Sequence, residues 1–297
     1  MRGRRGMGKR SLGILCILLA ALCWGFLPLL TRSLSALGIS PAASATMRAL
    51  VAAVILVILG CAKKDSLRFS SSKMLIYMAV MGIFTTAGMY LFYMSAVDLL
   101  STAMASMLLY TAPAFVILLS RIFYKEPITG KKLLCLILTL AGSALVVRIY
   151  DPASLFVNAA GIALGLASGV CYSLVTVMGR KALLYCSSTA VATWPVISGT
   201  LILVCITPPW QIDMSSPVLI VLYLLLGLIG SVLPLLLYNK GLALGVEGGQ
   251  AGILATIEPV VATLTGVVAF GDVLEGLQIA GIASVLAGAA LISFRKK

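Results

Sequence analysis

Ten apolar runs follow one another along this chain, and each is close to the length that a helix needs to cross a bilayer. They fall at residues 12–31, 41–61, 74–97, 101–120, 132–149, 158–178, 188–207, 217–238, 248–270 and 277–294. About 20 residues at 1.5 Å per residue cross roughly 30 Å of hydrocarbon. In lipid every backbone polar group needs a partner within the protein, so such runs have to be helices. The chain is therefore predicted to be an all-α integral membrane protein with ten transmembrane helices.

The composition excludes a water-soluble protein. Of the 297 residues, 61% are hydrophobic and 10% are charged, whereas a soluble domain carries about 25% charged residues. The first apolar run is too long for the core of a secretory signal, holds Trp24 and Pro28, and has no small-residue cleavage site after it. We therefore expect this run to remain as the first membrane span.

The basic residues sort to one side of the membrane. With the amino terminus in the cytoplasm, nineteen of the 22 Lys and Arg residues fall on the cytoplasmic side, Arg32 and Arg148 fall outside, and Arg48 lies within the second run. Both termini are thus predicted to be cytoplasmic. The net charge of +13 is spread over short loops, so it indicates topology and attraction to anionic lipid, not a nucleic-acid partner.

Catalytic and metal-binding groups are missing from the sequence. There is no histidine, and the seven cysteines lie in or beside apolar runs without a C-x-x-C pair, which is typical of small hydrophobic residues. No paired carboxylates, no serine with a candidate base and no phosphate-binding glycine loop occur. We therefore expect no metal, no cofactor and no enzyme activity. The alternatives to a carrier are a channel, although no run resembles a selectivity filter, and a membrane-embedded enzyme, which the missing groups disfavour.

The chain repeats itself. A shift of 146 residues pairs Pro113 with Pro259, Glu126 with Asp272, Gly130 with Gly276 and Gly142 with Gly288. A shift of 148 pairs Cys23 with Cys171, Trp24 with Tyr172 and Arg32 with Arg180. These matches indicate two five-helix units, 12–149 and 158–294. Because five is odd, the second unit enters the membrane from the opposite side, and such inverted repeats are typical of secondary transporters.

Several segments carry a family resemblance. They are "LCWGF" (22–26), "ATMRALVAAVIL" (45–56), "FYKEPITGKKLLCLILTLAGSALV" (123–146) and "TIEPVVATLTGVVAFGDVLEGLQIAGIASVLAGAALI" (256–292). With ten predicted spans, the chain resembles the EamA-type transporters of the drug/metabolite transporter superfamily. It departs from common members in having Asp272 where the second unit usually has Glu, and Phe26 and Leu27 after the "WG" pair.

The resemblance implies a carrier in a bacterial-type inner membrane that exports or exchanges a small molecule. It further implies a central cavity lined by the first, third, fourth, sixth, eighth and ninth helices, with the fifth and tenth on the periphery. Cargo differs widely within the family and includes amino acids, purines, sugar phosphates and drugs. The expected partners are thus a small-molecule substrate and membrane lipid, and a homodimer stays open.

Glu258 is the residue that most needs an explanation. It interrupts a long uncharged run near the expected midplane, where a charge costs about 2.5–3.5 kcal/mol on insertion scales. It either faces the cavity and binds an amine or a proton, or ties its helix to a neighbour. We favour the first role. For Arg48, the other charge well inside a run, we favour a structural role outside the cavity, although pairing with Glu258 stays open.

Prolines and aromatic residues complete the candidate site. Pro113 and Pro259 are expected to bend equivalent helices, as moving elements or as ordinary kinks. Aromatic side chains in the helices expected to face the cavity are candidate substrate contacts or packing residues. They are Trp24, Tyr90, Tyr93, Tyr110, Tyr172 and Tyr238.

Two stripes of small residues predict close helix contacts. Gly161, Gly165 and Gly169 should pack the sixth helix inside the bundle. Ala280, Ser284 and Gly288 should face either the fifth helix or a second copy of the chain.

Overall fold

Apolar runs become helices throughout the part of the chain that the computed structural model describes, namely residues 2–62, 67–152 and 158–294. Every regular element in these ranges is helical. Nine helical stretches there are long and apolar enough to cross a membrane: Gly8–Ala36, Pro41–Ala62, Ser72–Leu99, Thr102–Tyr124, Ala159–Ala182, Ser188–Ile206, Pro217–Ala243, Gly248–Phe270 and Gly276–Ser293. The prediction of an all-helical, multi-pass membrane protein is confirmed. Five residues counted in the charge sort, Lys63, Lys64, Arg295, Lys296 and Lys297, lie outside the described residues.

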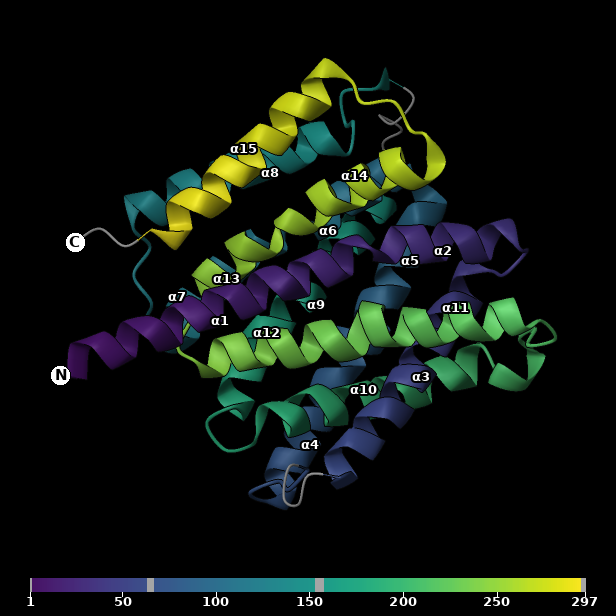
Figure 1. The fold of residues 1–297 in the computed structure, drawn as a ribbon, viewed down its shortest axis with the longest axis horizontal. Helices are drawn as coiled ribbons and strands as arrows, with labels where there is room; N and C mark the ends of the chain where they lie inside the picture. The colour runs from purple at the N-terminus through teal and green to yellow at the C-terminus, as the bar shows by residue number, and fades with distance from the viewer. Residues whose placement is uncertain (1, 63–66, 153–157, 295–297) are drawn as a thin grey trace.

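Several of these stretches consist of two or three consecutive helical elements (Figure 1). The elements are α1 (Arg2–Gly25), α2 (Leu27–Ala36), α3 (Pro41–Ala62), α4 (Ser72–Gly82), η1 (Ile83–Gly88), α5 (Met89–Leu99), α6 (Thr102–Leu109), α7 (Ala112–Tyr124), α8 (Gly130–Val146), α9 (Ala159–Ala182), α10 (Ser188–Ile206), η3 (Pro209–Gln211), α11 (Pro217–Gly227), η4 (Leu228–Val232), α12 (Leu233–Ala243), α13 (Gly248–Ala255), α14 (Ile257–Phe270) and α15 (Gly276–Ser293).

The interruptions fall at equivalent places in the two halves. The stretch Thr102–Tyr124 breaks before α7, whose second residue is Pro113, and Gly248–Phe270 breaks before α14, whose third residue is Pro259. A proline has no N–H to give to the preceding turn, which favours a break at that point. The stretches Ser72–Leu99 and Pro217–Ala243 each contain a widened π-helical turn, η1 and η4. Such turns expose backbone groups within a helix and are frequent at functional sites.

α8 and α15 lie side by side along one edge of the bundle (Figure 1). A Cβ atom on Gly142 would lie 2.7 Å from the carbonyl oxygen of Gly281, so the two helices meet backbone to backbone. The Ser284 hydroxyl donates to the Leu138 carbonyl at 2.8 Å. Within the chain, Ser284 and Gly288 thus face α8, which settles the partner of that part of the stripe.

The glycine stripe of α9 packs inside the bundle, as the sequence predicts. Cβ atoms on Gly161 and Gly165 would lie 2.7 and 2.5 Å from side-chain atoms of Leu100 and Leu108. On Gly169 the same atom would meet the Leu108 carbonyl at 2.8 Å. Small residues are therefore needed here for α9 to approach α6.

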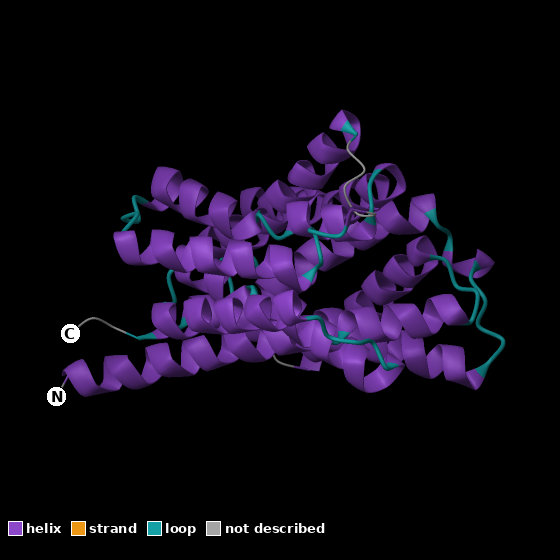
Figure 2. Ribbon diagram, turned by 90° about the horizontal axis from the view of Figure 1, so that it is seen from above, coloured by secondary structure: helices purple, strands orange, loops and turns teal. Residues whose placement is uncertain are grey.

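The bundle has two distinct ends. The helices run roughly along one direction, and the start of α1 and the end of α15 lie at the same end, here called the terminal end (Figure 2). The connection between α14 and α15 lies at the opposite end, here called the far end (Figure 1).

Candidate functional site

A large cavity occupies the middle of the bundle and reaches its far end. Its volume is about 1090 Å³, and its wall includes Trp24, Arg48, Tyr90 and Glu258. Residues near the far end, such as Asp272, line it as well. Ligand sites usually have volumes of about 300–1000 Å³, so the cavity has room for a small metabolite with some water.

Glu258 lies in the first turn of α14, at the wall of this cavity. Its carboxylate accepts a hydrogen bond of 2.9 Å from the Tyr172 hydroxyl on α9. Gly25, the last residue of α1, lets that helix approach closely, because a Cβ atom there would lie 3.0 Å from the Glu258 carbonyl oxygen and 2.4 Å from Val261. The glutamate is therefore held where α1, α9 and α14 meet.

Aromatic side chains surround this junction. The Trp24 ring lies 6.0 Å from that of Tyr172 in an edge-on arrangement and 5.4 Å from that of Tyr238. The Tyr238 hydroxyl is 2.7 Å from that of Thr176, and either may donate. A separate void of about 20 Å³, lined by Tyr110, Tyr172, Tyr238 and Glu258 among others, lies beside the junction. Glu258 thus borders both the large cavity and this small void.

The sequence-selected residues separate into two groups. The large cavity is lined by Trp24, Tyr90, Tyr93, Tyr110, Tyr172, Glu258 and Pro259. Tyr238 and Pro113 line the small void instead. The Tyr93 hydroxyl forms a hydrogen bond of 3.0 Å with the Ser106 hydroxyl. The buried Tyr90 hydroxyl has no hydrogen-bond partner in the described structure.

Arg48 also lines the large cavity, so the expectation that it lies outside the cavity is wrong. The Arg48 side chain passes Gly230 of η4, and a Cβ atom on that glycine would lie 3.3 Å from the arginine Cδ. Among the described residues Arg48 forms no ion pair, and it is not within ion-pair distance of Glu258. A charge at the centre of a membrane helix costs about 2.5–3.5 kcal/mol on insertion scales. A water-filled cavity is where such a group can be kept.

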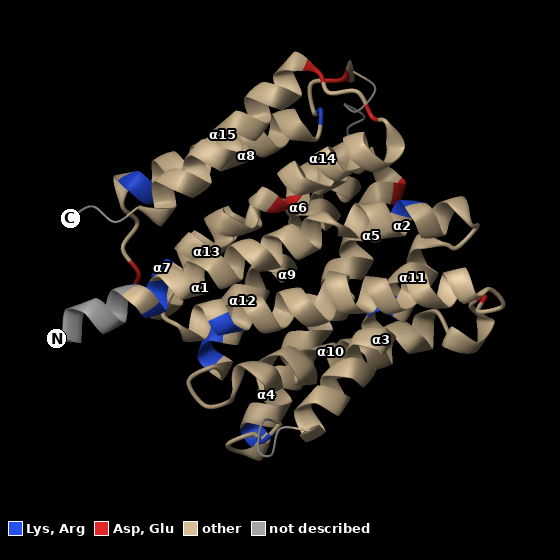
Figure 3. Ribbon diagram, viewed as in Figure 1, with Lys and Arg blue, Asp and Glu red and all other residues tan. Residues whose placement is uncertain are grey.

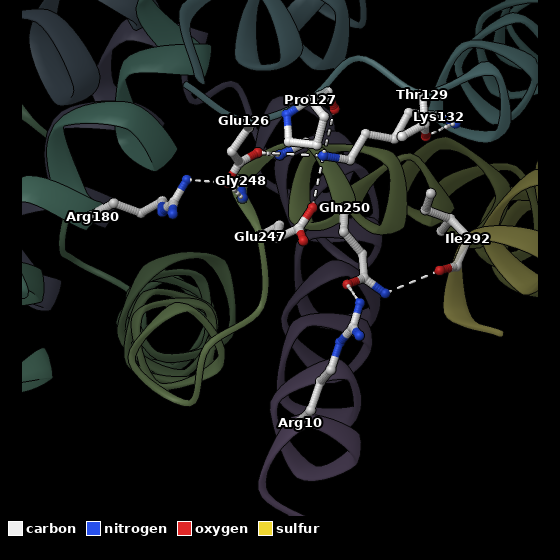
Figure 4. Close-up of polar contacts among 11 residues, drawn as sticks. Arg10, Glu126, Pro127, Thr129, Lys132, Arg180, Glu247, Gly248, Gln250 and Ile292 are labelled. Carbon is white, nitrogen blue, oxygen red and sulfur yellow. Dashed lines mark hydrogen bonds and ion pairs between the residues drawn. The ribbon is translucent and has the colours of Figure 1, made fainter. Parts of the chain in front are cut away.

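At the terminal end lies a cluster of polar contacts around Glu126, and none of its residues lines the large cavity (Figure 4). The Glu126 carboxylate accepts from Arg180 at 2.5 Å and from the backbone N–H groups of Gly248 and Gly249 at 3.2 and 3.4 Å. These two N–H groups open α13, and a helix start favours a negative charge. Lys132 adds a nitrogen 3.6 Å from the same carboxylate. This terminal cluster therefore ties α9 and α13 to the connection between α7 and α8.

Two further contacts extend the terminal cluster (Figure 4). Lys132 also pairs with Glu247 at 2.7 Å. The hydrogen bond from Lys132 holds the pKa of the Glu247 carboxyl below its ordinary value of 4.5, even though partial burial opposes this effect. Arg10 donates to the Gln250 side chain at 2.9 Å, and that amide in turn donates to the Ile292 carbonyl at 3.1 Å.

The far end is held more loosely. Figure 3 shows that the charged residues gather at the two ends of the bundle and are sparse between them. Arg32 pairs with Asp272 at 2.7 Å, but about half of each side chain is exposed. The hydrogen bond from Arg32 lowers the pKa of the Asp272 carboxyl. Arg148 and Tyr150 both contact Glu275. Arg32, Arg148, Asp272 and Glu275 all line the open cavity.

Reasoning from the sequence did not identify the terminal cluster as a functional feature. In the sequence, Glu126 stands out only because it matches Asp272 in the repeat, and Arg180 only because it matches Arg32. The available signal was that the two acids match under the shift of 146 and the two arginines under the shift of 148. What the sequence could not show is that the members of each pair meet in space.

In the part of the chain that the structure describes, helices surround a central cavity that reaches the far end of the bundle, an arrangement that transporters have. The EamA-like transporter family matches residues 11–148 and 159–294. A protein of Archaeoglobus fulgidus described as an uncharacterized transporter is 31% identical over 234 residues, covering 75% of this chain and 76% of that protein. The chain therefore belongs to the EamA-like transporter family and is a membrane transporter.

A second relative agrees with this membership, and a solved structure shares the fold. A second protein of Archaeoglobus fulgidus, also described as an uncharacterized transporter, is 27% identical over 216 residues, covering 70% of this chain and 74% of that protein. A protein of known crystal structure has a TM-score of 0.79 over 95% of this chain and 96% of its own. At 22% identity that structure supports the fold alone.

Proposed function

We propose that the chain is a secondary transporter that exports or exchanges a small amphipathic metabolite bearing an amine, such as an amino acid or a drug-like molecule. It would act in a bacterial-type inner membrane with both termini in the cytoplasm and would need no cofactor. Glu258 would bind the amine or take up a proton, and the aromatic wall would bind the apolar part. Under this topology the terminal end is cytoplasmic and the cavity opens outward.

One observation carries the proposal. The cavity places a carboxylate, Glu258, beside Trp24 and Tyr172 near the middle of a helix bundle. A bound cation is attracted electrostatically both by a carboxylate and by the faces of aromatic rings. The cavity is closed at the terminal end, where the Glu126 carboxylate is tied to α13. A site that faces one side only is what a carrier has, whereas a conducting channel is continuous.

Ten spans in two inverted units are part of the same proposal. α8 has 17 residues, one fewer than α15, the shortest of the nine stretches, and it packs along α15. We take α8 as the tenth span. Trp24 and Tyr172, which match under the shift of 148, touch each other, as residues near a two-fold axis between repeats would. Two such halves can expose a central site to either side in turn.

The remaining expectations follow from this assignment. Lipid would surround the bundle, and no nucleic acid would bind, since the basic residues are topological signals. Catalysis is not part of the proposal, because the matching family is one of transporters. A homodimer, if it forms, would not use Ser284 or Gly288, whose partner is α8.

The test is counterflow in proteoliposomes that are loaded with a pooled set of amino acids, nucleobases and organic cations. We expect uptake of a labelled solute that saturates and is stimulated by the same solute on the opposite side. Uptake that neither saturates nor responds to the opposite side would point to a channel. Lack of uptake of every solute would contradict this choice of cargo class.

A further inference from the structure

Arg48 faces the cavity, and no partner for its guanidinium occurs among the described residues. Arg48 lies seven residues into α3, which places it about 10 Å along the helix from Pro41. No hydrogen bond or ion pair to it occurs within the described ranges, although a guanidinium offers five N–H donors. The neighbouring Gly230 gives the side chain room to pass η4. The Arg48 guanidinium thus lies at the cavity wall, and its N–H donors are not used by any described residue.

A second unused donor lies nearby. The Tyr90 hydroxyl on α5 is buried and has no hydrogen-bond partner in the described structure. It lies close enough to Arg48 to interact with it electrostatically. Buried polar groups are nearly always bonded, so an unpaired one needs an explanation. A hydroxyl and a guanidinium that are both free together suit a planar anion, and a carboxylate fits the guanidinium fork with two parallel bonds.

The opposite charge lies across the same cavity. Glu258 interacts electrostatically with Arg48 but not as an ion pair. A bare cation would be repelled by Arg48, and a bare anion by Glu258. A molecule that carries both an amine and a carboxylate satisfies the two residues together.

We propose that Arg48, assisted by the Tyr90 hydroxyl, binds the carboxylate of a zwitterionic cargo whose amine is bound by Glu258. This assignment rests on the proposed function, in which Glu258 binds the amine. Arg48 then decides specificity, because it rejects amines that lack a carboxylate.

The test compares matched solutes in counterflow. Leucine and phenylalanine are each measured beside the amine and the carboxylic acid that share their side chain. We expect wild-type protein to exchange the zwitterions at least tenfold faster than either single-charge analogue. Arg48→Gln should lower zwitterion exchange at least tenfold without lowering amine exchange, and Arg48→Lys, which keeps the charge but loses the fork, should fall between them.

Controls separate binding from folding. Arg148→Gln removes an arginine that already contacts Glu275 at the cavity rim and should keep the preference for zwitterions. Unchanged amine exchange by Arg48→Gln shows that this variant folds. Wild-type exchange of amines but not of zwitterions would overturn the role of Arg48 and leave the proposed function intact. Lack of exchange of all six solutes by wild-type protein would count against both.

A second proposal comes from a different observation, the asymmetry between the two ends. At the terminal end Glu126 binds the first N–H groups of α13 and Arg180. The repeat equivalents are Asp272 and Arg32, and they also pair. The shift of 146 places Thr102, the first residue of α6, where Gly248 begins α13. Yet Asp272 is half exposed and accepts only from Arg32 in the described structure.

We propose that Asp272 accepts from the first N–H groups of α6 when the far end closes, beside the Ser101 hydroxyl that already accepts from the Met104 N–H, just as Glu126 binds the first N–H groups of α13 in the present state. The two carboxylates would then act in turn, so that release of one helix start accompanies capture of the other. Each cap fits a negative charge to the positive end of a helix. The arginine of each pair would move with its carboxylate.

The test measures the distance between spin labels on Thr102→Cys and Val273→Cys, both in exposed positions at the far end. The native cysteines are replaced in this background. We expect Glu126→Gln to populate a shorter distance, and Asp272→Asn added to it to remove that population. Asp213→Asn, a change of an exposed carboxylate elsewhere, should have no effect. A short distance that persists in the Glu126→Gln, Asp272→Asn double variant would overturn the proposal.

Discussion

Replacement of Glu126 by glutamine should open the terminal end. Glutamine keeps an oxygen that can accept from Gly248 and Gly249 but loses the charge. The side chain is only 10% exposed and accepts three hydrogen bonds. Hydrogen bonds to charged groups contribute about 1.5–3 kcal/mol, against about 0.5–1.5 kcal/mol for neutral pairs. Lys132 keeps Glu247 as a partner, so we expect a net loss of about 2 kcal/mol, or roughly a 30-fold shift toward the opened state.

Thiol labelling measures this shift. Gly252 lines the small void next to Glu258, and a Cβ atom there meets only ordinary contacts of 3.4 Å or more. In a background without native cysteines, Gly252→Cys should react with a membrane-impermeant maleimide only when the terminal end opens. Glu126→Gln should raise the labelling rate roughly 30-fold, given the free-energy loss above. The control Glu275→Gln, at the far end, should not raise it. A rate within about threefold of the parent would refute the closing role of Glu126.

Three further outcomes follow from the packing and charges. Gly142→Ala places a Cβ atom 2.7 Å from a backbone oxygen, so it should lower the free energy of unfolding by about 1–3 kcal/mol, as measured in thermal melts. Gly276→Ala meets open space and should leave this free energy unchanged. Because Glu247 has a lowered pKa in the folded protein, its stabilising contribution is present above its unfolded pKa and is lost as pH falls through the folded pKa. Melting temperatures of Glu247→Gln and wild type should therefore differ at pH 7 and converge only after the pH has fallen through the lowered pKa of Glu247, which lies below 4.5. Trp24→Ala should weaken the apparent affinity for cargo about tenfold in counterflow, roughly the value of one lost aromatic contact, while exposed Trp210→Ala should not.

Helices and their approximate ends were predictable, because a 20-residue apolar run in lipid has one solution. The π-helical turns were not. The segments "IFTTAG" at 83–88 and "LIGSV" at 228–232 hold no proline and look like ordinary apolar helix. In the structure η1 packs closely against α10, where a Cβ atom on Gly199 would lie 2.4 Å from Thr86, and such contacts between helices are not readable from one sequence.

Which face a residue presents was harder to predict than which helix holds it. The sequence assigns Arg48 to the right helix but not to the right face, since its side chain passes beside Gly230 and lines the cavity. Tyr238 was grouped with the cavity residues because its helix lines the cavity, yet its ring turns toward Thr176 and the small void. Side-chain direction within a bundle follows from interhelical contacts that one sequence does not contain.

The measurement that most directly tests the role of the cavity is counterflow by Glu258→Gln beside wild-type protein at two pH values, with Asp213→Asn as the control. We expect wild type and the control to accumulate a labelled solute. The Glu258→Gln variant should fail to do so, or lose only the pH dependence. Equal accumulation by Glu258→Gln and wild type at both pH values would contradict a transport role for Glu258. It would reduce the residue to a tie between α14 and Tyr172.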